Sequence, residues 1–131
     1  MLNSLDFPMV ANNDLQVWVR VRRSRNRSLV NLTGFSILWG MFNNGVEVIS
    51  KSTSDSTQIL IPDQTIPEMI GSFFLFLNAA DTLNLETEIH YTHEFVFTDP
   101  FSKNANPTAD DFELTAGKVW LRRQHKAQGS S

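Results

Sequence analysis

Two histidines are the first candidates for chemistry, because their spacing would suit metal binding on a helix. His90 and His93 are three positions apart. They lie, however, in an alternating apolar run that predicts a strand, and positions i and i+3 of a strand point to opposite faces. We therefore expect no zinc ion shared by these side chains, and we expect His93 to lie at the margin of the core.

Acidic residues near the C-terminal third could offer oxygen ligands to calcium. The group consists of Asp99, Asp110, Asp111 and Glu113. Its spacing lacks the glycine and the terminal glutamate of a calcium-binding loop. We expect a solvated loop and no bound metal.

A second acidic group could in principle supply the carboxylate pair of a glycosidase. Glu86, Glu88 and Glu94 share strand parity, but they alternate with apolar residues and so are expected to face solvent. The chain contains no cysteine nucleophile, no Gly-x-Ser-x-Gly turn, no phosphate loop, no GxGxxG turn and no HExxH pair. The sequence predicts a protein that is not an enzyme and carries no cofactor.

Five arginines crowd into eight positions between two apolar runs. They are Arg20, Arg22, Arg23, Arg25 and Arg27. Guanidinium groups bind carboxylate or phosphate in bidentate fashion, so the cluster could contact an anionic partner, or it could be a solvated hairpin tip paired with Asp and Glu. Nucleic acid is not expected, because the net charge is −3 and the stacking aromatics near the cluster are limited to Trp18.

The elements that position these residues are strands. Alternating apolar residues predict strands over the ranges 15–22, 35–42, 46–51, 57–61, 71–77, 86–99 and 117–122. A single helical turn capped by Asn78 is expected after the fifth of them. Residues 1–13 lack strand or helix periodicity and predict an irregular arm, which lies either over its own domain or on a neighbouring subunit. Residues 101–115 predict a long loop tethered by Phe101, Phe112 and Leu114.

Length and composition favour one domain with a single core. The chain has 131 residues, 41% of them hydrophobic, with ten Phe, three Trp and no Cys. We expect an arm at 1–13, an antiparallel β-sandwich of about seven or eight strands at 14–123 and a polar tail at 124–131. No window is apolar and long enough for a membrane span, so no membrane partner is expected.

Several large apolar residues fall on strand faces that are expected to be exposed to solvent. They are Trp18, Leu38, Phe42, Phe74, Phe76 and Trp120. An antiparallel sheet with one solvated face alternates cleanly, so apolar residues on both faces indicate a partner surface or a covering segment. The covering segments could be the arm and the 101–115 loop. Both interpretations remain open from the sequence.

A series of short motifs, in this order and spacing, resembles a known group of proteins. The motifs are D-x-x-x-x-V at 14–19, V-x-L-T-G-x-x-x-x-W at 30–39, G-x-F-x-x-x-L at 71–77, A-A-D-T-x-x-L at 79–85, I-x-Y-x-H-E-x-x-x-T-D at 89–99 and G-x-V-x-L at 117–121. Together they resemble small bacteriophage virion proteins with an immunoglobulin-like β-sandwich, similar to the N-terminal domain of phage baseplate upper proteins.

The resemblance implies a virion structural protein of the tail, baseplate or fibre attachment, made in the cytoplasm of the bacterial host. Its implied partners are other virion proteins and copies of itself, and no catalytic residues are implied. The arginine-rich hairpin departs from the group and leaves room for a capsid decoration or cement subunit. A glycan-binding module that grips host surface sugars through Trp18 or Trp120 is a further alternative. The candidate contact residues are Trp18, Arg20, Arg22, Arg23, Arg25, Arg27, Phe42, Phe74, Phe76 and Trp120.

Overall fold

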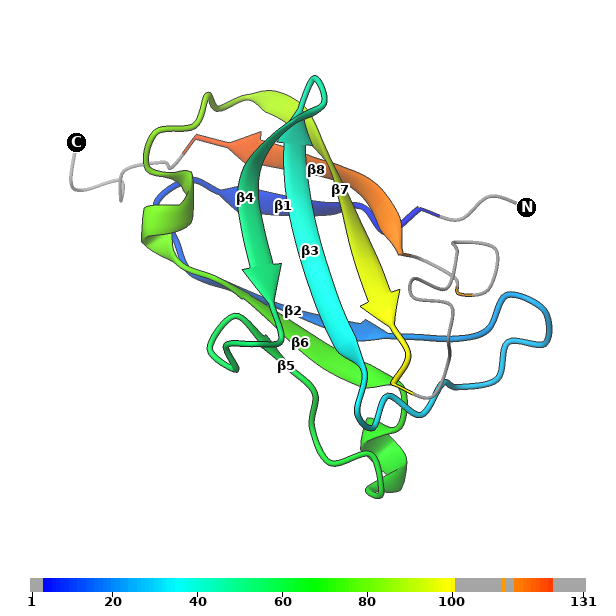
Figure 1. Ribbon diagram of the computed structural model, residues 1–131. Coiled ribbons are helices and arrows are strands. Elements are labelled where there is room, and N and C mark those ends of the chain that lie inside the picture. Colours follow the sequence, from blue (N-terminus) through cyan, green and yellow to red (C-terminus); the bar gives the residue numbers. More distant parts are fainter. Residues whose placement is uncertain (1–3, 101–111, 113–114, 124–131) are drawn as a thin grey trace.

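The protein is a β-sandwich in the computed structural model, which describes residues 4–100, 112 and 115–123 (Figure 1). This part of the chain forms eight strands and two short 3₁₀ helices. In chain order they are β1 (Phe7–Val10), β2 (Leu15–Arg20), β3 (Ser36–Asn43), β4 (Val46–Ser52), β5 (Ile59–Leu60), η1 (Pro67–Met69), β6 (Ser72–Leu77), η2 (Ala79–Thr82), β7 (Ile89–Thr98) and β8 (Ala116–Arg122). The all-β prediction is confirmed.

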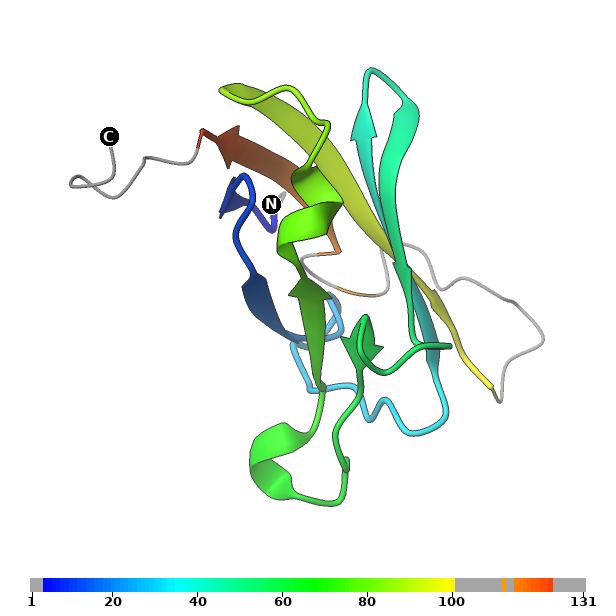
Figure 2. The same cartoon turned by 90° about the vertical axis from the view of Figure 1, so that its left-hand side faces the viewer.

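The strands form two sheets that face each other across the core (Figures 1 and 2). One sheet has five strands in the order β1-β8-β7-β3-β4, and the other has three in the order β2-β6-β5. Every pairing is antiparallel except β1 with β8. Each sheet buries one face against the other, which is why the period-two pattern of the sequence predicted most strands correctly.

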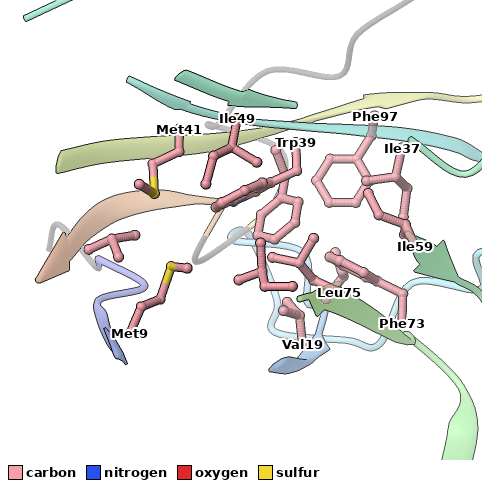
Figure 3. Close-up of a cluster of buried hydrophobic side chains, with 14 of the residues drawn as sticks. Met9, Val19, Ile37, Trp39, Met41, Ile49, Ile59, Phe73, Leu75 and Phe97 are labelled. Carbon is pink, nitrogen blue, oxygen red and sulfur yellow. The ribbon is translucent and has the colours of Figure 1, made fainter. Parts of the chain in front are cut away.

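The core is built from the alternating residues of the facing strands. Ile37 and Trp39 project from β3 toward Phe73 and Leu75 on β6, and Met41 projects toward Met9 on β1 (Figure 3). Aromatic rings dominate the centre, and the Phe73 ring meets that of Phe95 edge to face, with centroids 4.9 Å apart. Such edge-to-face pairs add about 1 kcal/mol each beyond the area that they bury.

A buried ion pair links the two layers at the β4 edge. Lys51 points inward from β4 with only 6% of its side chain exposed, and its Nζ lies 2.8 Å from Oδ2 of Asp81 in η2. The ladder between β3 and β4 shifts register after Met41, which is a β-bulge. The hairpin prediction for these two strands is correct, but the sequence did not indicate that a lysine lies inside.

The N-terminal segment differs from the irregular arm that was expected. Phe7–Val10 forms β1, which runs parallel to β8 at the edge of the five-stranded sheet, and Met9 is buried in the core. Four residues that include Pro8 are too short to show a period, and the strand is fixed by tertiary pairing instead. The segment therefore lies on its own domain, as one of the two expectations had it.

The short strand β5 and the short helix η2 are both shaped by hydrogen bonds to nearby aspartates. The strand predicted over 57–61 is reduced to β5, because Asp55 turns the chain by accepting hydrogen bonds from the Thr57 backbone N–H and hydroxyl at 2.9 and 2.7 Å. The predicted helical turn is η2, and Asn78 precedes it, with its backbone N–H donating to Asp81 Oδ2 at 2.8 Å.

The long loop is described at one tether only. Phe112 is buried, and its ring contacts Phe35 and Phe97 with centroid distances of 6.3 and 5.1 Å. This part of the loop prediction is confirmed. Phe101, Leu114, the acidic residues Asp110, Asp111 and Glu113, and the tail at 124–131 lie outside the described residues.

Candidate functional site: the outer face of the three-stranded sheet

An aromatic row lies on the outer side of the three-stranded sheet. Trp18 on β2 pairs across the ladder with Phe74 on β6, and their rings are stacked with centroids 6.1 Å apart at an interplanar angle of 28°. Phe76 continues the row at 6.5 Å and 21° from Phe74, and Leu60 on β5 lies opposite Phe74. We call Trp18, Leu60, Phe74 and Phe76 the aromatic face.

Strand parity determines which side chains form the aromatic face. Val17 and Val19 of β2 point inward with Phe73, Leu75 and Leu77 of β6, so the residues between them must point outward. Trp18 keeps 54% of its surface exposed. A large indole left in water on a sheet face has not found its full packing partner within the described chain.

A hydrogen bond fixes the orientation of the exposed indole. Nε1–H of Trp18 donates to the Ser72 hydroxyl at 2.9 Å, and Ser72 is fully buried beneath it. Since the indole has one polar group and that group is satisfied from below, its outer surface is wholly apolar. The site can therefore bind by shape and burial, without rearrangement of Trp18.

The two ends of the aromatic face are polar and carry opposite charge. At one end Arg20 is held by its own chain, because Nε donates to the Ile70 carbonyl at 3.3 Å and Nη2 to the Pro67 carbonyl at 3.5 Å. At the other end a hollow of about 510 Å³ is lined by Asp14, Gln16, Leu60, Phe76 and Asn78, among others. Oδ1 of Asp14 accepts the Ala79 N–H at 2.9 Å.

Two other predicted contact residues lie on the opposite side of the sandwich. Phe42 is on the outer face of the five-stranded sheet, where its ring folds back over Gly40. Trp120 is also on that sheet, beside His90, with ring centroids 4.5 Å apart. The apolar residues predicted to face outward are thus divided between two surfaces and do not form one continuous patch.

The arginine cluster forms the predicted hairpin tip but does not act as one group. The Arg23 N–H donates to the Ser28 carbonyl at 2.9 Å, and the Arg27 N–H to the Arg23 carbonyl at 2.8 Å, with Arg27 at a φ of 61°. Nη1 of Arg22 donates to the Arg27 carbonyl at 2.9 Å and helps to close the turn. Arg23, Arg25 and Arg27 remain exposed at the tip.

The two histidines lie on opposite faces of β7, as strand parity predicted. His93 is buried more deeply than expected: Nδ1 accepts the Trp39 Nε1–H at 3.0 Å, and Nε2 lies 2.5 Å from the Leu5 carbonyl oxygen. Because the indole only donates and the carbonyl only accepts, the ring must be neutral with its proton on Nε2. Burial lowers the pKa of His93, while the Leu5 carbonyl and Asp6 oppose that shift. Its role in this geometry is structural.

Within residues 4–100, 112 and 115–123, no group of three or more His, Asp or Glu side chains is placed to hold a metal ion. No helix in the same residues has the length and apolar character needed to cross a lipid bilayer. Comparison with protein-family models and with curated protein sequences found no match to the chain.

Sequence reasoning identified the aromatic residues of this site but not its rim. Leu60 and Gln16 were not singled out, and Asn78 was predicted only as a helix cap, because their place beside Phe74 and Phe76 depends on the β2–β6–β5 register. The only signal in the sequence was that Leu60 alternates with two isoleucines, which put it on the outer face.

Proposed function

We propose that the protein is a structural subunit of a bacteriophage particle, in a tail, baseplate or fibre-attachment position, and that it acts through protein–protein contacts. The aromatic face is the observation that carries this proposal. The resemblance of the sequence motifs to phage virion proteins is the reason for placing these contacts in a phage particle. The contact surface is proposed to be centred on Trp18, with no catalytic step.

The strand arrangement supports an immunoglobulin-like classification of the sandwich. Immunoglobulin domains pack a B-E-D sheet against a G-F-C sheet that variable types extend with C′. The order β2-β6-β5 against β8-β7-β3-β4 matches that arrangement when β2 is taken as strand B. The parallel strand β1 then lies beside the last strand, at the edge of the larger sheet.

Two side-chain contacts support the same classification. The Tyr91 hydroxyl, near the start of β7, donates to the Glu86 carbonyl at 2.6 Å, as in the tyrosine corner of immunoglobulin domains. Those domains also place a cysteine two residues after this tyrosine and a buried tryptophan on strand C against its disulfide. Here Trp39 on β3 bonds His93, so a hydrogen bond takes the place of the disulfide contact.

The chemistry of the aromatic face suits a protein partner. Trp is among the residues that contribute most to protein interfaces, and an exposed, pre-oriented indole loses little side-chain entropy on binding. Removal of such a side chain costs about 2 kcal/mol, or roughly thirtyfold in affinity. We therefore expect Trp18→Ser to lower incorporation of the protein into particles strongly.

The experiment compares phage particles assembled with wild-type protein, Trp18→Ser and Leu38→Ser. Leu38 is the matched control, because 53% of its surface is exposed on the opposite sheet. Quantitative mass spectrometry of purified particles should find the wild-type and Leu38→Ser proteins at equal copy number and the Trp18→Ser protein depleted. Equal incorporation of all three proteins contradicts the proposed contact surface.

The hollow beside Phe76 favours glycan binding as a second candidate. Asp14, Gln16 and Asn78 could hydrogen-bond sugar hydroxyl groups next to an aromatic platform. A glycan array probed with isolated protein separates the two functions. Sugar binding that is lost in Trp18→Ala but kept in Trp120→Ala favours the glycan module, whereas no binding to any glycan favours the structural subunit. A capsid decoration subunit would use the same protein contacts, and its location in the particle distinguishes it.

A further inference from the structure

The edges of the two sheets differ in how they are protected against strand pairing. Exposed edge strands usually carry a proline, a bulge, an inward charge or very few residues, because an open ladder invites another strand. Among the described strands, β1 contains Pro8, β4 contains the bulge and the inward Lys51, and β5 has two residues. Three of the four edges are therefore blocked.

The fourth edge, β2, has none of these devices. Its sequence Leu-Gln-Val-Trp-Val-Arg contains no proline, glycine or lysine, and its six residues pair with β6 in one continuous register. Figure 2 shows β2 as the outermost strand of its sheet, with β6 on its inner side. Among the four edges, β2 is therefore the one that carries no protection against pairing with another strand.

Hydrogen-bond parity identifies the backbone groups that β2 offers. The Val21 N–H donates to the Gly71 carbonyl, and the Phe76 N–H to the Gln58 carbonyl, so the odd-numbered residues of β2 bond β6. The backbone N–H and C=O groups of Gln16, Trp18 and Arg20 consequently point away from β6, in the plane of the sheet and toward its open edge. No described hydrogen bond occupies these groups.

The charges at the two ends of β2 are complementary to each other. Asp14 precedes the strand and Arg20 ends it. Asp14 uses Oδ1 for the Ala79 N–H and leaves Oδ2 without a described partner. Arg20 likewise leaves Nη1 without one. A strand with opposite charges at its ends is self-complementary when two copies meet antiparallel across a two-fold axis.

We propose that β2 pairs antiparallel with β2 of a second copy of this chain, so that the two three-stranded sheets become one continuous sheet. In the favoured register Asp14 lies opposite Arg20 of the second copy, and Gln16 lies opposite Trp18 of the second copy. In this register the N–H and C=O groups of Gln16, Trp18 and Arg20, which do not bond β6, face the same groups of the second copy. The two aromatic faces join on one side and form a wider contact surface. This inference depends on the proposed function only for its biological role.

The pairing is tested by sedimentation velocity of the full chain over a concentration series up to about 100 μM, because small isologous contacts have Kd values near the micromolar range. We expect a concentration-dependent species of twice the 14.9 kDa chain mass. Arg20→Glu should raise the dimer Kd about tenfold, since it sets like charges opposite each other at two symmetric places. The double variant Asp14→Lys/Arg20→Glu should restore the wild-type Kd.

Two further variants separate edge pairing from other causes. Gln16→Pro removes an outward N–H without touching the β2–β6 ladder and should abolish the dimer, with circular dichroism and thermal melting as checks on folding. Val46→Lys is the matched control on the edge of the other sheet, where Val46 is 66% exposed, and should dimerise like the wild type.

The proposal is overturned by wild-type protein that stays monomeric throughout the series. It is equally overturned by a dimer that Arg20→Glu leaves unchanged or that Val46→Lys abolishes. A monomer that still enters phage particles overturns the pairing alone. A dimer that never enters particles overturns the proposed function alone.

Discussion

At the scale of single residues, the central contact of the core is between Trp39 and His93. The chain has no cysteine, and this hydrogen bond links β3 to β7 inside the sandwich. On its other side the His93 ring reaches the Leu5 carbonyl and packs edge to face on Phe7, at a centroid distance of 5.0 Å. One neutral histidine thus joins the N-terminal segment to the core.

The burial of His93 predicts an acid-sensitive fold. Its pKa is lowered in the folded state, so the unfolded chain takes up the proton first as pH falls. Stability is therefore complete above the unfolded value of about 6.5 and declines as pH falls from there toward the folded pKa. Asp6, the nearby charged group that opposes the shift, moderates the loss.

Urea unfolding between about pH 7.5 and 5.5 measures this loss, because most carboxylates remain ionised over that window. We expect His93→Gln to have lower stability at pH 7.5 and a flatter pH profile. His90→Gln, on the exposed face of the same strand, should keep the wild-type profile. An unchanged profile in His93→Gln would show that another group causes the acid sensitivity.

At the scale of the elements, period-two patterning predicted the strands that bury one face. It worked for β3 and β7 because each sets its alternate side chains into a single core, so position and burial agree. It failed for β1, where Pro8 interrupts a run of four residues whose ladder pairing is with β8, a strand distant in the sequence. The β4 bulge and the inward Lys51 were also beyond sequence reasoning, because both depend on neighbours that are distant in the chain.

A glycine in β8 fixes how closely the N-terminal segment approaches. A Cβ at Gly117 would collide with the Leu5 carbonyl oxygen and would lie 2.6 Å from Asp6 Oδ1. The same segment is tied to β8 by the Leu5 N–H to the Ala116 carbonyl at 2.9 Å, and by the Lys118 N–H to Asp6 at 2.8 Å. A glycine inside a strand often marks such an approach of backbone to backbone.

Gly117→Ala should therefore displace residues 4–10 and destabilise the fold by about 1–3 kcal/mol, as overpacking does. Hydrogen exchange should show faster exchange of the β1 amides in this variant. Lys118→Ala, at the exposed neighbouring position, is the matched control and should exchange like the wild type. Equal protection of β1 in Gly117→Ala would contradict the close approach.

At the scale of the whole molecule, the apolar residues outside the core are sorted onto two opposite surfaces. The sequence indicated which side chains leave the core, because parity is a local property. It could not assign Trp18 and Trp120 to different sheets, since that assignment depends on strand order. The hollow beside Phe76 likewise arises where β2, β5 and β6 meet.

This arrangement suits a subunit that is held between neighbours. The aromatic face can bind one partner while the exposed hairpin tip at Arg23 and Arg25 remains available to another. Pairing through β2 adds a contact between copies without covering the aromatic face. The proposed role therefore requires no conformational change in the sandwich.

The central claim is that Trp18 contacts another protein in an assembled phage particle, and a cryo-electron microscopy map of that particle tests it most directly. The account predicts density for the sandwich at a fixed position, with the aromatic face covered by a neighbouring chain. A map in which the subunit is present but the Trp18 indole faces solvent in every copy would contradict it, and so would particles that lack the subunit altogether.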